Sequence, residues 1–106
     1  MSTKNITLSK MEKEFSPLTF GRLLKSHRLG EEMTQVELAK KLKISKQGLN
    51  DLEHGRKIPS LRRTIKIARR IGLLEDLLIQ LVLQDQLRKE KLNFTVNLSR
   101  RLQKAS

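Results

Sequence analysis

The segment from Thr34 to Gly55 constrains the fold of this 106-residue chain more than any other part of its sequence. Residues 34–37, Thr-Gln-Val-Glu, form a capping box, in which a hydroxyl and a carboxylate satisfy free amides at the start of a helix. Ser45 can cap a second helix, and Gly55 can take the left-handed conformation that ends it. Two short helices joined by a tight turn at residues 43–44 are therefore predicted.

Apolar residues at helical spacing predict one helix before this unit and two after it. The first covers about residues 18–29. Ser60 caps the next, which ends at Gly72. The last, over about residues 74–91, is apolar almost all round, so it needs cover on more than one side, and a second copy of the chain is the expected cover. The inward stripes are expected at Phe20, Leu23, Leu24 and His27, at Leu38, Ala39 and Leu42, at Leu49 and Leu52, and at Leu61, Ile65, Ala68 and Ile71.

The chain is predicted to divide into four parts. Residues 1–16 form an N-terminal arm, 17–73 a helical domain, 74–99 a C-terminal helix and strand, and 100–106 a basic tail. The strand is predicted over residues 94–98, Phe-Thr-Val-Asn-Leu, because apolar and polar residues alternate there. Its unpaired amides need a partner, which is either the same strand of a second copy or residues 6–8 of the arm.

The net charge of +12 is concentrated in the middle of the chain, where residues 34–70 carry +8 of it. A basic patch on one compact unit is the electrostatic footprint of a polyanion partner. There is no Cys, and the two His have no ligand spacing, so we expect neither metal nor cofactor. Membrane-helix and secretory-signal patterns are also missing, so we expect a cytoplasmic protein without membrane contact.

Residues 18–73 contain an ordered set of motifs: Phe20-Gly21-Arg22-Leu23-Leu24 with Arg28, Thr34 to Leu42 (Thr-Gln-Val-Glu-Leu-Ala-Lys-Lys-Leu), Leu52-Glu53-His54-Gly55, Pro59-Ser60-Leu61 and Ile67-Ala68. In this order and spacing they resemble the Cro/C1-type (Xre) helix-turn-helix family. The resemblance implies an all-α, lambda-repressor-like bundle of four to five helices, to which the short C-terminal strand is added. It also implies that the third helix lies in the major groove of double-stranded DNA.

Two residues depart from the family pattern. Lys43 stands where the family often has Gly in the turn, so a residue other than Gly is expected at positive φ there. Gly48 is unusual inside the third helix, which it should weaken by about 0.5–1 kcal/mol relative to Ala. It could instead allow close approach to the second helix or to DNA.

A helix that enters the major groove offers its first residues to the base edges. Those expected to read bases are Lys46, Gln47, Asn50 and Asp51, which match the reading positions of the family. Lys can donate to guanine, and the amides of Gln and Asn can pair with adenine through two hydrogen bonds.

Other residues are expected at DNA phosphates, where they contribute affinity without sequence preference. For Arg62, with its neighbours Arg63 and Lys66, a solvated helix face is the alternative, and for His54 it is a plain helix cap. By resemblance, Arg28 and Glu53 form a buried structural ion pair, so Glu53 is no catalytic acid. The phosphate contacts are expected at Gln35, Ser45, His54, Arg56, Lys57 and Arg62.

Three functions remain open from the sequence. The favoured one is a homodimeric repressor that reads a two-fold symmetric operator, since one short recognition helix makes few base contacts. The second is an antitoxin that holds a toxin and represses its own operon, and the third is an adaptor that binds proteins. No catalytic constellation is present, so an enzyme is not expected. The dimer interface is expected at Leu77, Leu78, Leu81, Val82, Phe94 and Val96.

Overall fold

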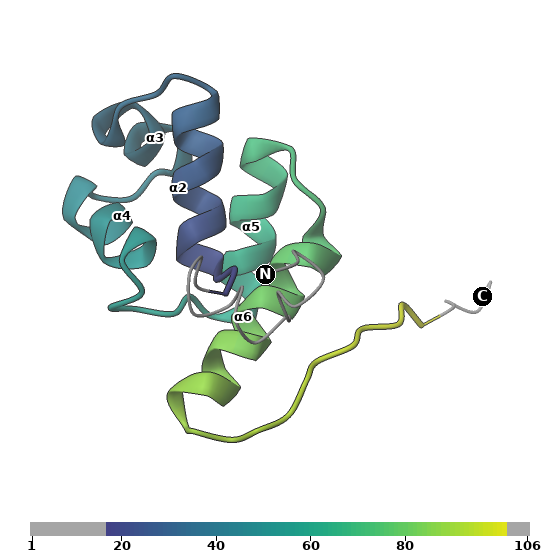
Figure 1. The fold of residues 1–106 in the computed structure, drawn as a ribbon. Helices are drawn as coiled ribbons and strands as arrows, with labels where there is room; N and C mark the ends of the chain where they lie inside the picture. Colours follow the sequence, from purple (N-terminus) through teal and green to yellow (C-terminus); the bar gives the residue numbers. More distant parts are fainter. Residues whose placement is uncertain (1–16, 102–106) are drawn as a thin grey trace, which may run out of the picture.

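The computed structural model describes residues 17–101, so the expected arm and the end of the expected tail lie outside the described residues. This part of the chain folds into five helices and contains no strand, which confirms the all-α bundle. Figure 1 shows α2 in the middle of the bundle, with α3 and α4 on one side of it and α5 and α6 on the other. The helices are α2 (Phe20–Gly30), α3 (Gln35–Leu42), α4 (Lys46–Glu53), α5 (Leu61–Ile71) and α6 (Glu75–Lys89).

Local capping sets the ends of α3 and α4 as predicted. The Glu37 amide donates to the Thr34 hydroxyl (3.1 Å), and the Glu37 carboxylate accepts from the Thr34 amide (2.8 Å). Ser45 caps α4 by accepting from the amide of Gly48 (2.9 Å). Lys43, between the two helices, has φ 57° and ψ 43°, which is the left-handed conformation expected for this turn. The sequence signals therefore placed the helix-turn-helix unit correctly.

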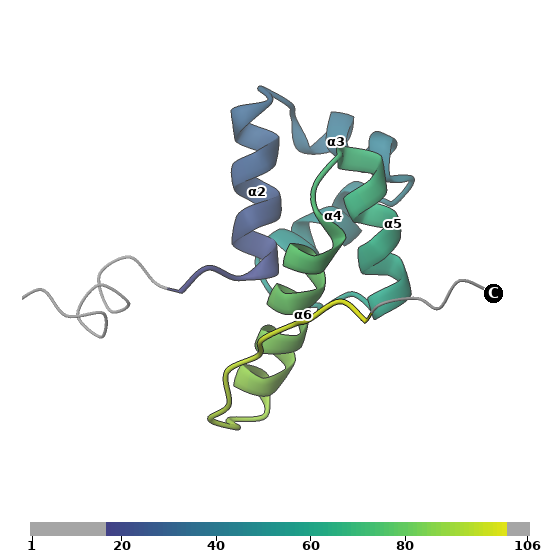
Figure 2. The same cartoon turned by 90° about the vertical axis from the view of Figure 1, so that its right-hand side faces the viewer.

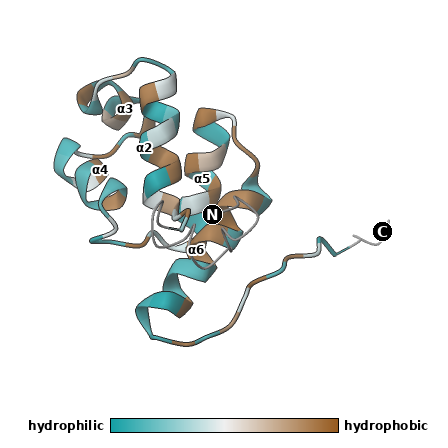
Figure 3. Ribbon diagram, in the orientation of Figure 1, coloured by the Kyte–Doolittle hydropathy of each residue, from teal (hydrophilic) through white to brown (hydrophobic). Residues whose placement is uncertain are grey.

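One core joins all five helices, and Figure 3 shows the hydrophobic stretches of the helices turned toward one another. The stripe predicted for α2 is correct, since Phe20 and Leu24 are buried and Leu23 packs against them. The stripe predicted for α5 is wrong in its first half, because Leu61 is exposed. The buried side chains of α5 are Thr64, Ile67, Ala68 and Ile71.

Gly21 allows α2 to lie directly against the last turn of α4. A Cβ atom at this position would come within 2.3 Å of the Leu52 carbonyl oxygen and 2.7 Å of the Glu53 carbonyl oxygen. Real Cβ atoms essentially never approach other atoms so closely. The backbones of α2 and α4 can therefore touch only where α2 has no side chain.

Helix α6 is covered by its own chain. It packs against α5 and α2, and Leu78 (1% exposed), Leu81 and Val82 (0%) belong to the common core. The expectation that these three residues contact a second copy is therefore wrong. Residue 73 is also no boundary of the core, since helices on both sides of it contribute. Among residues 17–101, no helix combines the length and the apolar character needed to cross a membrane.

Residues 92–101 run back along α6 as an extended segment without a strand (Figure 2). The side-chain amide of Gln84 holds this segment, because it donates to the Phe94 carbonyl (2.8 Å) and accepts from the Val96 amide (2.9 Å). An ion pair between Arg100 and Asp76 holds it further along. The strand predicted for residues 94–98 is thus wrong for the described chain, where a helix side chain makes the contacts that a neighbouring strand would make. The alternative partner at residues 6–8 lies outside the described residues.

Candidate nucleic-acid interface

The first turn of α4 presents its side chains to solvent. Lys46 and Gln47 are exposed, and Asn50, one turn later, is half-buried. The opposite face of α4 holds Leu49 and Leu52 in the core. Three of the residues predicted to read bases therefore lie along one accessible edge of a helix that is anchored from behind.

A buried ion pair connects α2 to the end of α4, as predicted for Arg28 and Glu53. Arg28 Nε donates to Glu53 Oε2 (2.7 Å), and Nη2 donates to Glu53 Oε1 (3.1 Å). A third donor, Nη1, reaches the Met33 carbonyl (3.1 Å) in the loop before α3. Two parallel hydrogen bonds between a guanidinium and a carboxylate fix both the distance and the relative orientation of the two side chains. Arg28 therefore fixes α2, α4 and the start of α3 relative to one another.

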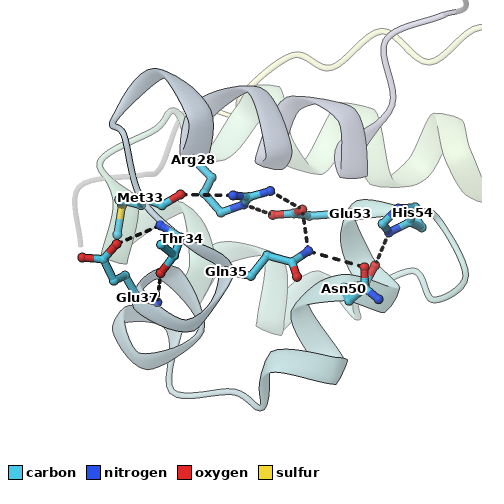
Figure 4. A network of polar contacts seen from close by, with 8 residues as sticks. All are labelled: Arg28, Met33, Thr34, Gln35, Glu37, Asn50, Glu53 and His54. Atoms are coloured by element: carbon cyan, nitrogen blue, oxygen red, sulfur yellow. Dashed lines mark hydrogen bonds and ion pairs between the residues drawn. The ribbon is translucent and has the colours of Figure 1, made fainter.

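This ion pair extends into a chain of polar contacts that reaches the exposed edge of α4 (Figure 4). The side-chain amide of Gln35 donates to Glu53 Oε1 (3.1 Å) and, at 3.4 Å, to Asn50 Oδ1. The backbone carbonyl of Asn50 in turn contacts Nδ1 of His54 (2.9 Å). The position of the Asn50 side chain thus depends on a carboxylate in the interior.

The pKa of Glu53 lies below its usual value. Burial raises it, but hydrogen bonds from Arg28 and Gln35 and the positive charges of Arg28 and Lys25 lower it by more. The side chain of Glu53 has no solvent-exposed surface. It is therefore a buried carboxylate that stays ionised because its partners donate to both oxygens.

The start of α3 combines a fixed side chain with an open main chain. Both amide hydrogens of the Gln35 side chain are directed into the protein, toward Glu53 and Asn50. Its main-chain amide has no hydrogen-bond partner within the described part of the chain. The open amides of a helix N-terminus form an anion site, and Ser45, which caps α4, is exposed to solvent as well.

Asp51 organises the loop that follows α4. Its carboxylate accepts from Arg56 Nε (2.9 Å) and Gln47 Nε2 (3.1 Å) and lies 3.7 Å from Lys57 Nζ. Its backbone carbonyl accepts from the amides of Arg56 (2.9 Å) and Lys57 (3.3 Å). The hydrogen bond from Arg56 is the largest cause that lowers the pKa of Asp51, and Gln47 and the charge of Lys57 add to it. Both carboxylate oxygens of Asp51 are thus engaged within the protein.

The structure shows which neighbour the small size of Gly48 accommodates. A Cβ atom there would lie 3.0 Å from Ser45 Oγ, and no other neighbour lies within 4 Å. The glycine therefore leaves room for the capping hydroxyl, and close approach to α3 is not its purpose.

Sequence reasoning missed the positioning role of two residues, since it expected Asp51 to read bases and named Gly21 only as part of a motif. Gly21 sets the contact between α2 and α4, and Asp51 ties the basic loop to α4. A carboxylate four residues after Gln47 and five before Arg56 was visible in the sequence, and helical spacing brings the first pair together. No local signal identifies Gly21, because its contacts lie more than 30 residues away.

Comparisons with known proteins agree with this geometry. Residues 24–78 match the family described as helix-turn-helix. An uncharacterized HTH-type transcriptional regulator of Methanocaldococcus jannaschii is 42% identical over 57 residues, which are 53% of this chain and 86% of that protein. No solved structure matches the chain at a significant level. The chain therefore belongs to the Cro/C1-type (Xre) helix-turn-helix family.

Proposed function

We propose that this protein is a transcription regulator that binds specific sequences of double-stranded DNA with α4 in the major groove. The observation that carries the proposal is the accessible edge of α4, formed by Lys46, Gln47 and Asn50 and anchored from behind by the buried pair of Arg28 and Glu53. A rigidly held edge of α4 favours base reading, because fewer side-chain rotamers must be fixed when DNA binds.

Each residue of the edge has a distinct chemistry. Lys46 can donate to O6 and N7 of guanine, while the amides of Gln47 and Asn50 suit the N6 and N7 of adenine. Asp51 is better suited to position Gln47 and Arg56, because its Oδ1 already accepts hydrogen bonds from both and its Oδ2 faces the Lys57 ammonium in an ion pair. We therefore assign base reading to the first three residues and a positioning role to Asp51.

Phosphate contacts are proposed on both sides of α4. On one side lie the open amide of Gln35 and the exposed Ser45. On the other lie His54, Arg56 and Lys57 in the loop, followed by Arg62 at the start of α5, all of them exposed. These groups add affinity that falls with salt and does not depend on base sequence.

Replacing Gln47 and Asn50 together by Ala should abolish sequence preference. Each lost two-bond contact costs about 1–3 kcal/mol of discrimination against the wrong base, so operator affinity should fall at least about tenfold and approach that for random DNA. Binding is measured by fluorescence anisotropy with both duplexes. The control is Gln86→Ala, which removes an exposed amide from α6. Equal operator preference in the double variant and the control would contradict the assignment.

We further propose that the active form is a homodimeric repressor, since two recognition helices double the base contacts. The interface we propose is the outer side of residues 92–98 together with Leu77. Phe94 is 66% exposed, and Leu77, Leu92 and Leu98 are exposed as well. The main chains of Thr95 and Asn97, on the side of this extended segment opposite to Gln84, have no hydrogen-bond partner in the described chain. The extended segments of two copies can hydrogen-bond to each other through these free main-chain groups.

Phe94→Glu should shift the protein from dimer to monomer, because it places a charge in the apolar centre of this interface. Sedimentation at micromolar concentration measures the change. Val36→Glu is the control, because it places the same charge on an exposed apolar residue of α3. A wild-type protein that sediments as a monomer at this concentration would remove the dimer from the proposal.

The same apolar edge favours a second candidate function, an antitoxin that also represses its own operon. In that case the occupant of the surface at Phe94 is a toxin. Co-expression with the product of the neighbouring gene separates the two functions: a stable complex that Phe94→Glu disrupts supports the antitoxin, while self-association alone supports the dimeric repressor.

A further inference from the structure

A second basic surface lies beside the base-reading edge, in a groove between the α3–α4 turn and α5. Its volume is about 410 Å³, within the range of small-molecule sites. Five of the nine residues that line it are basic and none is acidic: Lys43, Arg62, Arg63, Lys66 and Arg70. This composition distinguishes it from the cavity beside Asp85, which has basic and acidic residues in its lining.

The positive charges of this groove are not neutralised by the protein. Within residues 17–101, none of the five forms an ion pair, although Arg28, Arg56, Arg69, Arg88 and Arg100 all do. Arg70 is fixed in place, because its Nη1 donates to the Leu42 carbonyl at the end of α3 (2.9 Å). A guanidinium has five N–H donors, so most of those of Arg70 remain for a ligand.

The shape of the groove suits a ligand with more than one negative group. Arg62, Lys66 and Arg70 recur every four residues, which places them on one face of α5 in a row about 12 Å long. The open N-terminal turn of α5 adds its partial positive charge at one end of this row. Leu42 and Ile67 are buried beneath the row and keep water from one side, which strengthens electrostatic attraction above them.

Lys43 provides a further argument, because the fold does not favour a lysine at this position. Its φ of 57° is a conformation that glycine adopts without steric cost and other residues adopt with strain. A glycine would complete the turn equally well but would leave the lip of the groove without its charge. Lys43 therefore brings to the groove a positive charge that the conformation of the turn does not require.

We infer that this groove is a binding site for closely spaced phosphate groups, separate from the edge of α4 that reads bases. Two sources offer this chemistry: the backbone of DNA bound by α4, and a free oligophosphate. For the DNA source the inference rests on the proposed function, whereas a free oligophosphate would bind whether or not the protein recognises DNA.

Calorimetric titration with inorganic tripolyphosphate at low salt tests the site. Lys43→Gly, Lys66→Gln and Arg70→Gln should each weaken binding by about threefold or more, as expected for the loss of one partly exposed charge contact. The control is Arg69→Gln, which removes an equal charge from the same helix, outside the groove and in an ion pair with Glu75. Lys43→Gly should also melt no lower than the wild type, which separates its ligand role from a structural one.

The salt dependence of DNA binding by the same variants identifies the source. If the groove holds DNA backbone, each groove variant lowers the slope of log affinity against log salt by about 1 and the control does not. An unchanged slope with weakened tripolyphosphate binding supports a free oligophosphate. Equal losses in the control and the groove variants would show that net charge alone attracts the anion, and would overturn the inference. If the protein binds tripolyphosphate through the groove but does not bind DNA, the proposed function is refuted and the inference about the groove still holds.

Discussion

Gly21→Ala is expected to lower the melting temperature by about 10 °C or more, a large effect for the addition of one methyl group. The new Cβ would meet two backbone carbonyls of α4, at 2.3 and 2.7 Å, and backbone cannot move aside as a flexible side chain can. Overpacking typically costs about 1–3 kcal/mol, and about 1 kcal/mol shifts the melting temperature of a domain of this size by about 4–8 °C. Thermal unfolding followed by circular dichroism measures the change.

The control for this substitution lies at the end of the same helix. A Cβ at Gly30 would meet no atom within 4 Å, and Gly30 has no positive φ. Gly30→Ala should therefore leave the melting temperature unchanged or raise it slightly, since Ala restricts the unfolded chain. If both variants melted alike, the close contact between α2 and α4 would not be what makes position 21 special.

Glu53→Gln is expected to destabilise the domain by about 3–5 kcal/mol, because it keeps the shape of the side chain but leaves the charge of Arg28 buried without a partner. Stability is measured by urea unfolding. Glu31→Gln, an exposed change just after α2, should stay within about 0.5 kcal/mol of the wild type. DNA binding should also weaken in Glu53→Gln, since Gln35 and Asn50 depend on the same carboxylate.

The effect of Glu53→Gln should depend on pH. The pKa of Glu53 is lower in the folded state than in the unfolded state, so its contribution to stability is present above the unfolded value of about 4.3. It is lost as pH falls through the lower, folded value. The stability difference between wild type and variant should therefore be constant from pH 7 to about pH 5 and shrink below that. A difference that stayed constant down to pH 3 would show that charge is not what Glu53 contributes.

The sequence by itself determined the helix ends and the unit they enclose. Thr34, Ser45 and Gly55 act on groups within a few residues of themselves, so their effects could be predicted without knowing the rest of the fold. The same holds for the left-handed Lys43, which lies between two predicted caps. The exposed edge of α4 followed in turn, because helical spacing places Lys46, Gln47 and Asn50 away from Leu49 and Leu52.

Only the tertiary structure decided what covers each helix. The apolar pattern of α5 suggested Leu61 and Ile65, but the directions of α3 and α6 select the stripe that contains Thr64 and Ile67. Thr64 can be buried because its hydroxyl donates to the Ser60 carbonyl (2.7 Å). Burial depends on where distant elements lie, and no local pattern encodes that.

The same reason explains α6 and the segment after it. The sequence showed correctly that α6 needs cover, but it could not show that α5 and α2 supply it in place of a second copy. Alternation at residues 94–98 showed an extended chain, and only the return of that chain along α6 brings Gln84 to its backbone. Local chemistry thus determined the conformation of each segment, while packing between segments far apart in the chain determined which segments contact one another.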